Sequence, residues 1–94
     1  MGRKIFKYQV PCCDEVAINM PAGAEILAVQ AQYNRPCIWA IVTPENPLVE
    51  KWFCIRGTGH GLKGNEGKYI GTFQVQGGDL IFHVFEMKEG GQWQ

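Results

Sequence analysis

The residues with the clearest capacity for chemistry lie between positions 56 and 67. This segment contains five of the chain's 12 glycines and one of its two histidines. Glycine permits positive φ and close backbone approach, so such a loop can direct its N–H groups toward an anion. The pattern predicts a phosphate-binding loop formed by Arg56, Gly57, Thr58, Gly59 and His60. The alternative is a long connection that needs glycine only to turn.

Other residues of the chain have side chains that suit a nucleotide. Gln30 and Gln32 project from one face of an expected strand, and amides can bind a base edge or a ribose hydroxyl. Tyr33 and Tyr69 offer rings for stacking on a base. Arg35, like Arg56, is a planar donor suited to a phosphate. The alternatives are core packing for the aromatic rings and simple solvent exposure for the glutamines.

Catalytic and metal-binding patterns are weak by comparison. His83 lies on an apolar strand, where a core or interface position is the commoner role, which leaves His60 as the better candidate. The sequence contains no Gly-x-Ser-x-Gly, His-Glu-x-x-His or phosphate-loop motif. Cys12 and Cys13 are adjacent, a poor spacing for two ligands of one zinc ion. We therefore expect neither an enzyme nor a cofactor nor a metal.

Size and charge restrict the possible partners. Ninety-four residues with 46% hydrophobic composition predict a single β domain over residues 1–94. Nine basic and nine acidic residues balance, which argues against duplex nucleic acid as a partner but permits a small anion. No signal peptide and no membrane-spanning run is visible. We expect a cytoplasmic chain with reduced cysteines and no membrane partner.

Hydrophobic alternation with a period of two predicts an all-β fold of about seven strands, in a compact sandwich or small barrel. The first two strands should pair as a hairpin, Trp39 should lie in the core, and a long glycine-rich hairpin loop should join the fifth and sixth strands. Residues 88–94 are expected to be a frayed tail. The expected strands are 4–10, 16–20, 25–33, 37–42, 49–56, 69–76 and 80–86.

Three tryptophans and five phenylalanines give so short a chain a large apolar surface to bury. A small β domain must also protect its strand edges by closure or by pairing with another copy. Both observations predict a symmetric homo-oligomer.

Several segments, taken in order, carry a family resemblance: MPAGAEILAVQAQ (20–32), PCIWAIV (36–42), FCIRGTGHG (53–61), YIGTFQ (69–74) and LIFHVFE (80–86). Together they resemble a widespread family of small bacteriophage proteins that is described only as a domain of unknown function. The chain is also similar to the phage anti-CBASS sponge proteins. That resemblance implies a non-catalytic oligomer that sequesters a cyclic nucleotide signal of bacterial antiviral immunity.

Three functions are compatible with these observations. The first is a sponge for a cyclic dinucleotide such as cyclic GMP–AMP in the cytoplasm of an infected bacterial host. In it the loop residues contact phosphate, Tyr33 or Tyr69 stacks on a base, and Gln30 or Gln32 reads a base or sugar edge. The second is a phage or host protein-interaction module without a nucleotide ligand. The third is a small phosphodiesterase-like enzyme that uses His60.

Overall fold

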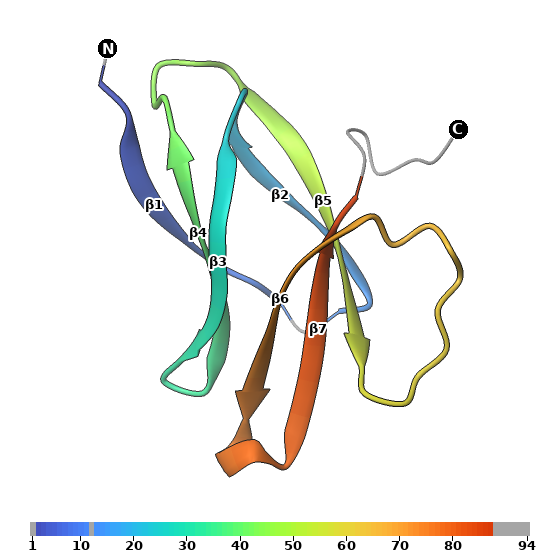
Figure 1. The fold of residues 1–94 in the computed structure, drawn as a ribbon. Helices are drawn as coiled ribbons and strands as arrows, with labels where there is room; N and C mark the ends of the chain where they lie inside the picture. The colour runs from blue at the N-terminus through green and yellow to red at the C-terminus, as the bar shows by residue number, and fades with distance from the viewer. Residues whose placement is uncertain (1, 12, 88–94) are drawn as a thin grey trace.

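The computed structural model describes residues 2–11 and 13–87, which form two antiparallel sheets (Figure 1). A three-stranded sheet has the order β1-β4-β3, and a four-stranded sheet has the order β2-β5-β7-β6. The all-β prediction is confirmed, and each predicted strand lies within two residues of an observed one. The expected tail, 88–94, lies outside the described residues. The elements are β1 (Lys4–Gln9), β2 (Glu15–Pro21), β3 (Glu25–Gln32), β4 (Arg35–Val42), β5 (Leu48–Gly57), β6 (Lys68–Val75), the 3₁₀ turn η1 (Gln76–Gly78) and β7 (Leu80–Glu86).

The core lies between the two sheets and is built from alternate residues of their strands. Ile38 and Ala40 of β4, Phe53 of β5 and Val84 of β7 are completely buried. Alternation of side chains along a strand places such residues on one face and leaves their neighbours on the other. The inner faces of both sheets therefore supply one continuous apolar core.

A bulge in β3 changes which residues reach this core. Regular alternation along β3 would place Leu27 on the same face as Val29, but the register with β4 shifts between Ile26 and Ala28. The extra residue of a bulge leaves the regular alternation. As a result, Leu27 is 48% exposed, and Ile26 packs against the core in its place.

Two predicted connections were wrong. β1 pairs with β4 and β2 pairs with β5, so the first two strands lie in different sheets and do not form a hairpin. β7 lies between β5 and β6, so the glycine-rich connection passes from one strand to a non-neighbour and is not a hairpin loop (Figure 1). Alternation identifies strands but carries no information about their partners.

The outer face of the three-stranded sheet carries polar and aromatic residues. Trp39 was predicted to be in the core, but it alternates with the buried Ile38 and Ala40 and is only half-buried. Its register partners are Lys7 on β1 and Ala28 on β3. Trp39 therefore belongs to the outer face.

Close contact between β3 and β6 joins the two sheets at one side. Gly71 of β6 lies so near Val29 of β3 that a Cβ at position 71 would overlap the Cγ1 atom of Val29. Glycine is the residue that permits such an approach of two backbones.

Candidate functional site

Arg56 is buried beneath the glycine-rich connection. It is 8% exposed, and its Nη1 donates a hydrogen bond of 2.9 Å to the carbonyl oxygen of Asp14. Its Nε lies 3.4 Å from Oε2 of Glu66, and its Nη2 lies 3.6 Å from Oε2 of Glu15. A guanidinium held by two carboxylates and a carbonyl serves the fold. We therefore assign Arg56 to the fold rather than to the phosphate that the sequence suggested.

Glu66 anchors the far end of the same connection. Its carboxylate accepts hydrogen bonds from the backbone N–H groups of Lys63, at 2.6 Å, and Gly64, at 3.0 Å. The bond from Lys63 is the main cause that holds the pKa of Glu66 below its ordinary value of 4.5, and burial opposes the shift. The bond from Gly64 and the charge of Arg56 lower this pKa further. The ionised carboxylate thus stabilises the folded loop.

A pH titration of stability should show this contribution. Because the folded pKa of Glu66 is depressed, its stabilisation is present above about pH 4.5 and is lost as the pH falls through the folded value. We expect Glu66→Gln to be less stable than the wild type near neutral pH. Its free energy of unfolding should also fall less between about pH 6 and about pH 3. Urea titrations across that range check this, and parallel curves for the two proteins would contradict it.

Thr58 and Tyr69 belong to a chain of hydrogen bonds on the outer face of the four-stranded sheet. The hydroxyl of Thr58 lies 2.8 Å from Nε2 of His83, and the hydroxyl of Thr72 lies 2.9 Å from Nδ1 of the same ring. The hydroxyl of Tyr69 lies 2.5 Å from that of Thr72. The ring of Tyr69 packs edge-on against Phe85, with centroids 5.8 Å apart. The hydroxyl groups of Thr58 and Tyr69 are thus engaged in internal hydrogen bonds, while Tyr69 remains 54% exposed.

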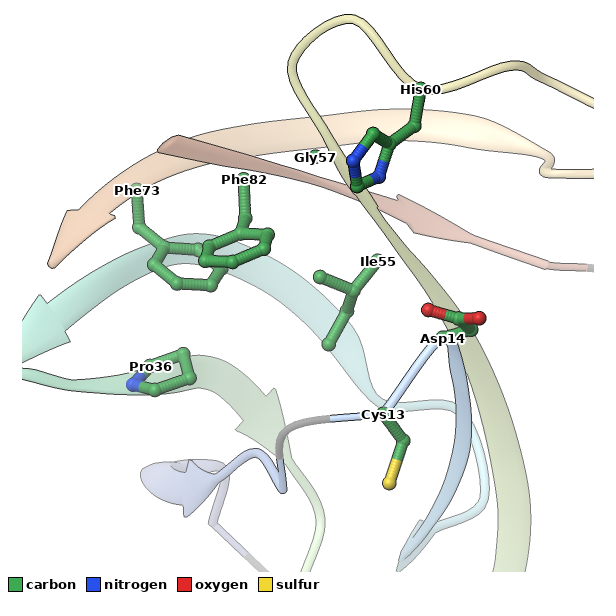
Figure 2. Close-up of a pocket in the computed structure, with 8 residues that line it drawn as sticks. All are labelled: Cys13, Asp14, Pro36, Ile55, Gly57, His60, Phe73 and Phe82. Carbon is green, nitrogen blue, oxygen red and sulfur yellow. The ribbon is translucent and has the colours of Figure 1, made fainter. Parts of the chain in front are cut away.

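A cavity of about 160 Å³ opens at one end of the sandwich (Figure 2). His60 lies at its rim, and Gly57 is placed directly beneath the imidazole. A Cβ on Gly57 would lie 2.9 Å from Cε1 of His60. The backbone N–H of His60 donates to the carbonyl of Gly57 at 3.1 Å, and Gly59 between them has a φ of 87°. The turn formed by these glycines therefore places His60 at the cavity. The complete lining is Cys13, Asp14, Pro36, Ile55, Gly57, His60, Phe73 and Phe82.

A second hollow, the groove, lies on the outer face of the three-stranded sheet and encloses about 350 Å³. Lys7 donates from Nζ to Oε1 of Gln32 at 2.6 Å, and Arg35 faces solvent. Within residues 2–11 and 13–87, neither cation has a carboxylate partner, and no carboxylate lines the groove. The groove therefore presents two uncompensated positive charges. Its lining is Lys7, Gln9, Gln32, Tyr33, Arg35 and Cys37.

Tyr33 stands at the edge of the groove in an unusual conformation. It and Asn34 form the two-residue loop between β3 and β4, with φ values of 52° and 64°. Positive φ at both positions is what a type I′ turn requires, and such turns favour asparagine and glycine over a bulky residue. Asn34 accepts a hydrogen bond of 2.6 Å from the backbone N–H of Gln76, which holds the turn against η1. Tyr33 as a whole is 91% exposed.

The predicted site residues thus fall into two groups. Arg56, Gly57, Thr58, Gly59 and His60 together line a further hollow of about 210 Å³. Gly57 and His60 line the cavity, whereas Gln32 and Tyr33 line the groove, and the two hollows share no lining residue. Gln30 is exposed on β3.

Comparison with protein families adds one finding. The family model described as "Domain of unknown function (DUF7352)" matches residues 1–94. The chain belongs to the DUF7352 family. This confirms the expectation of a family of unknown function. No curated protein and no solved structure matches the chain.

Two general properties of this DUF7352 protein bear on its site. Over residues 2–11 and 13–87, no helix is long and apolar enough to cross a membrane. In the same ranges, no group of three or more His, Cys, Asp or Glu residues is arranged to hold a metal ion.

Sequence reasoning missed Lys7 as a candidate in this DUF7352 chain, and it did not place Asp14 in one site with His60. Lys7 alternates with the aromatic residues Phe6 and Tyr8 along its strand, and its charge beside Gln9 was a usable signal. Asp14 follows a turn, and nothing in its neighbourhood along the chain indicates that it meets His60. Only the pairing of β2 with β5 brings the two to one cavity.

Proposed function

We propose that this protein is a non-catalytic binding protein that sequesters a cyclic dinucleotide, such as cyclic GMP–AMP. It acts in the cytoplasm of an infected bacterial host, as an anti-CBASS sponge encoded by a phage. The groove takes the ligand: Lys7 and Arg35 bind phosphate, and Tyr33 stacks on a base. The observation that carries this proposal is the exposed side chain of Tyr33, held on a strained backbone beside two uncompensated cations.

Tyr33 has no role in folding that would explain its presence. It is 91% exposed, so it buries little apolar surface. A left-handed backbone at a residue other than glycine disfavours the fold by roughly 1–3 kcal/mol. Such strain gathers where a side chain is needed for function. Stacking on a base is the interaction that an exposed, rigid ring supplies, at about 1–3 kcal/mol.

The charges and amides of the groove support a phosphate-bearing nucleotide. The guanidinium of Arg35 can bind a phosphate in two-pronged fashion, and Lys7 adds a point charge. Gln9, Gln30 and Gln32 lie on the same outer face, and their amides can both donate to and accept from a base or sugar. The volume of about 350 Å³ lies within the ~300–1,000 Å³ usual for small-ligand sites.

The sequence resemblance narrows the ligand class. The segments 20–32, 36–42, 53–61, 69–74 and 80–86 resemble a family of small bacteriophage proteins of unknown function. The chain is also similar to the phage anti-CBASS sponge proteins, which sequester cyclic nucleotides. A cyclic dinucleotide carries two bases and two phosphates, so it would use both the ring and the cations of the groove. Compared with the sequence-based assignment, the phosphate contacts move from Arg56 and the glycine-rich connection to Lys7 and Arg35.

A substitution at Tyr33 should separate stability from binding. Asparagine tolerates the left-handed conformation, so we expect Tyr33→Asn to stabilise the fold by about 1 kcal/mol, a rise of roughly 4–8 °C in Tm. Loss of the stacking ring should weaken cyclic GMP–AMP binding by roughly 5- to 30-fold, equivalent to ~1–2 kcal/mol. Differential scanning calorimetry and isothermal titration calorimetry measure the two effects.

Tyr33→Phe is the matched control, because it keeps both the ring and the backbone strain. We expect wild-type affinity and a wild-type Tm from it. Unchanged affinity in Tyr33→Asn would overturn the stacking role, and a lowered Tm would show that the ring supports the fold instead.

We further propose that the protein acts as a homo-oligomer. β1 is an edge strand whose Ile5 is 61% exposed and whose Phe6 is 37% exposed. An exposed edge with apolar side chains is suited to pairing with a second copy. Sedimentation at micromolar concentration should give a mass of at least two chains, whereas the mass of one chain would contradict this.

A further inference from the structure

The cavity at the end of the sandwich has two chemically different sides (Figure 2). On one side the rings of Phe73 and Phe82 are stacked, with centroids 5.4 Å apart and an interplanar angle of 29°, beside Ile55. On the other side lie the imidazole of His60 and the carboxylate of Asp14. An apolar wall facing a few polar groups is typical of a site for a small organic ligand.

The size of the cavity limits its occupant to one small ring. Its volume is about 160 Å³. An engineered apolar cavity of about 150 Å³ takes up one benzene molecule. A whole dinucleotide is too large, but a single pyrimidine-sized ring fits.

Asp14 is positioned to accept hydrogen bonds from such a ring. Its carbonyl oxygen accepts from Nη1 of Arg56 at 2.9 Å and from the backbone N–H of Ile55 at 2.8 Å, which fixes its backbone. Its side chain, in contrast, has no hydrogen bond or ion pair with the described residues, 2–11 and 13–87. A carboxylate only accepts, so it favours a ring that carries an amino group over one that carries a carbonyl oxygen there.

His60 forms the second polar wall, and its position depends on a glycine. The imidazole lies directly over Gly57, where any side chain would press on the ring. The carbonyl of Gly57 also holds the backbone of His60. Because His60 lies close over an apolar pocket, its imidazole presents a flat face against which a ring can pack.

We infer that this cavity binds a single aromatic ring bearing an amino group, with the ring between Phe82 and His60 and the amino group donating to Asp14. The site is separate from the groove. Pro36 lines the cavity, whereas its neighbours Arg35 and Cys37 line the groove on the opposite face of β4. The inference therefore goes beyond the proposed function and does not rest on it.

Cytosine and uracil are matched probes for this site. Cytosine carries an amino group at the ring position where uracil carries a carbonyl oxygen. NMR titration of the full chain with each base follows the methyl signals of Ile55 and the ring signals of His60. We expect saturable shifts at both residues and a dissociation constant for cytosine about 10-fold below that for uracil. Signals of Tyr33 should move little.

Two variants test the roles of the walls. Asp14→Asn should remove most of the preference for cytosine, and Gly57→Ala should weaken both bases while keeping the preference, since its methyl group displaces His60. Circular dichroism and thermal unfolding confirm that each variant folds. Equal binding of the two bases by the wild type, an unchanged preference in Asp14→Asn, or shifts confined to Tyr33 and Arg35 would each overturn the inference.

Discussion

Replacing Arg56 with methionine should lower the free energy of unfolding by about 3 kcal/mol. Methionine has a similar length and fits an irregular buried space, so the change mainly removes the charge and the donors. Glu66 would then keep only its backbone donors, and the carbonyl of Asp14 would lose a donor in a partly buried place. We expect the lower end of the ~3–5 kcal/mol range for broken buried ion pairs, because the side chain of Glu15 is 34% exposed.

Arg3→Met is the matched control for this measurement. Nη1 of Arg3 lies 3.1 Å from Oε1 of Glu25, a shorter separation than either ion pair of Arg56, but both side chains are about two-thirds exposed. Exposed ion pairs contribute roughly 0–1 kcal/mol. Urea denaturation should therefore separate the two variants clearly. An Arg56→Met protein as stable as Arg3→Met would show that the buried ion pairs of Arg56 with Glu15 and Glu66 do not matter for the fold.

Removing both cations of the groove should have the largest effect on ligand binding. Each charge-assisted hydrogen bond to a phosphate is worth about 1.5–3 kcal/mol, so each of Lys7→Met and Arg35→Met should weaken cyclic GMP–AMP binding by roughly 10-fold or more. Both side chains are exposed and lack carboxylate partners among the described residues, so the double variant should fold normally.

The control for this double variant removes the same number of positive charges from the surface outside the groove. Arg3→Met with Lys63→Met removes two exposed cations that do not line the groove. We expect near wild-type affinity from it, and a weaker dependence of affinity on salt only in the groove variant. Equal losses in the two double variants would place the phosphate contacts outside the groove.

The strands of this protein follow from local sequence, but their arrangement does not. The alternation of apolar and polar residues, as around Phe6 and Tyr8, can be recognised from a stretch of only a few residues. This is because every second side chain of a strand faces the core. The pairing of β1 with β4 depends on contacts across some 30 residues of chain, for which alternation carries no signal. The bulge at Leu27 is equally invisible, since no glycine or proline marks it.

The candidate site was predictable in its residue types more than in its geometry. Tyr33 and Gln32 were singled out by their chemistry, and the structure brings them together with Lys7 and Arg35. The burial of Arg56 was not predictable, because a cation before a glycine-rich segment suggests an anion site whether or not it is exposed. Its burial arises from Glu15 and Glu66, which lie in other segments of the chain.

We propose that the groove binds a cyclic dinucleotide without cleaving it. The most direct measurement is calorimetric titration of the full chain with cyclic GMP–AMP and related cyclic dinucleotides, followed by heat denaturation and chromatography of the released ligand. We expect saturable binding of at least one of them and recovery of that ligand intact. No binding to any of them, or recovery of a cleaved product, would contradict it.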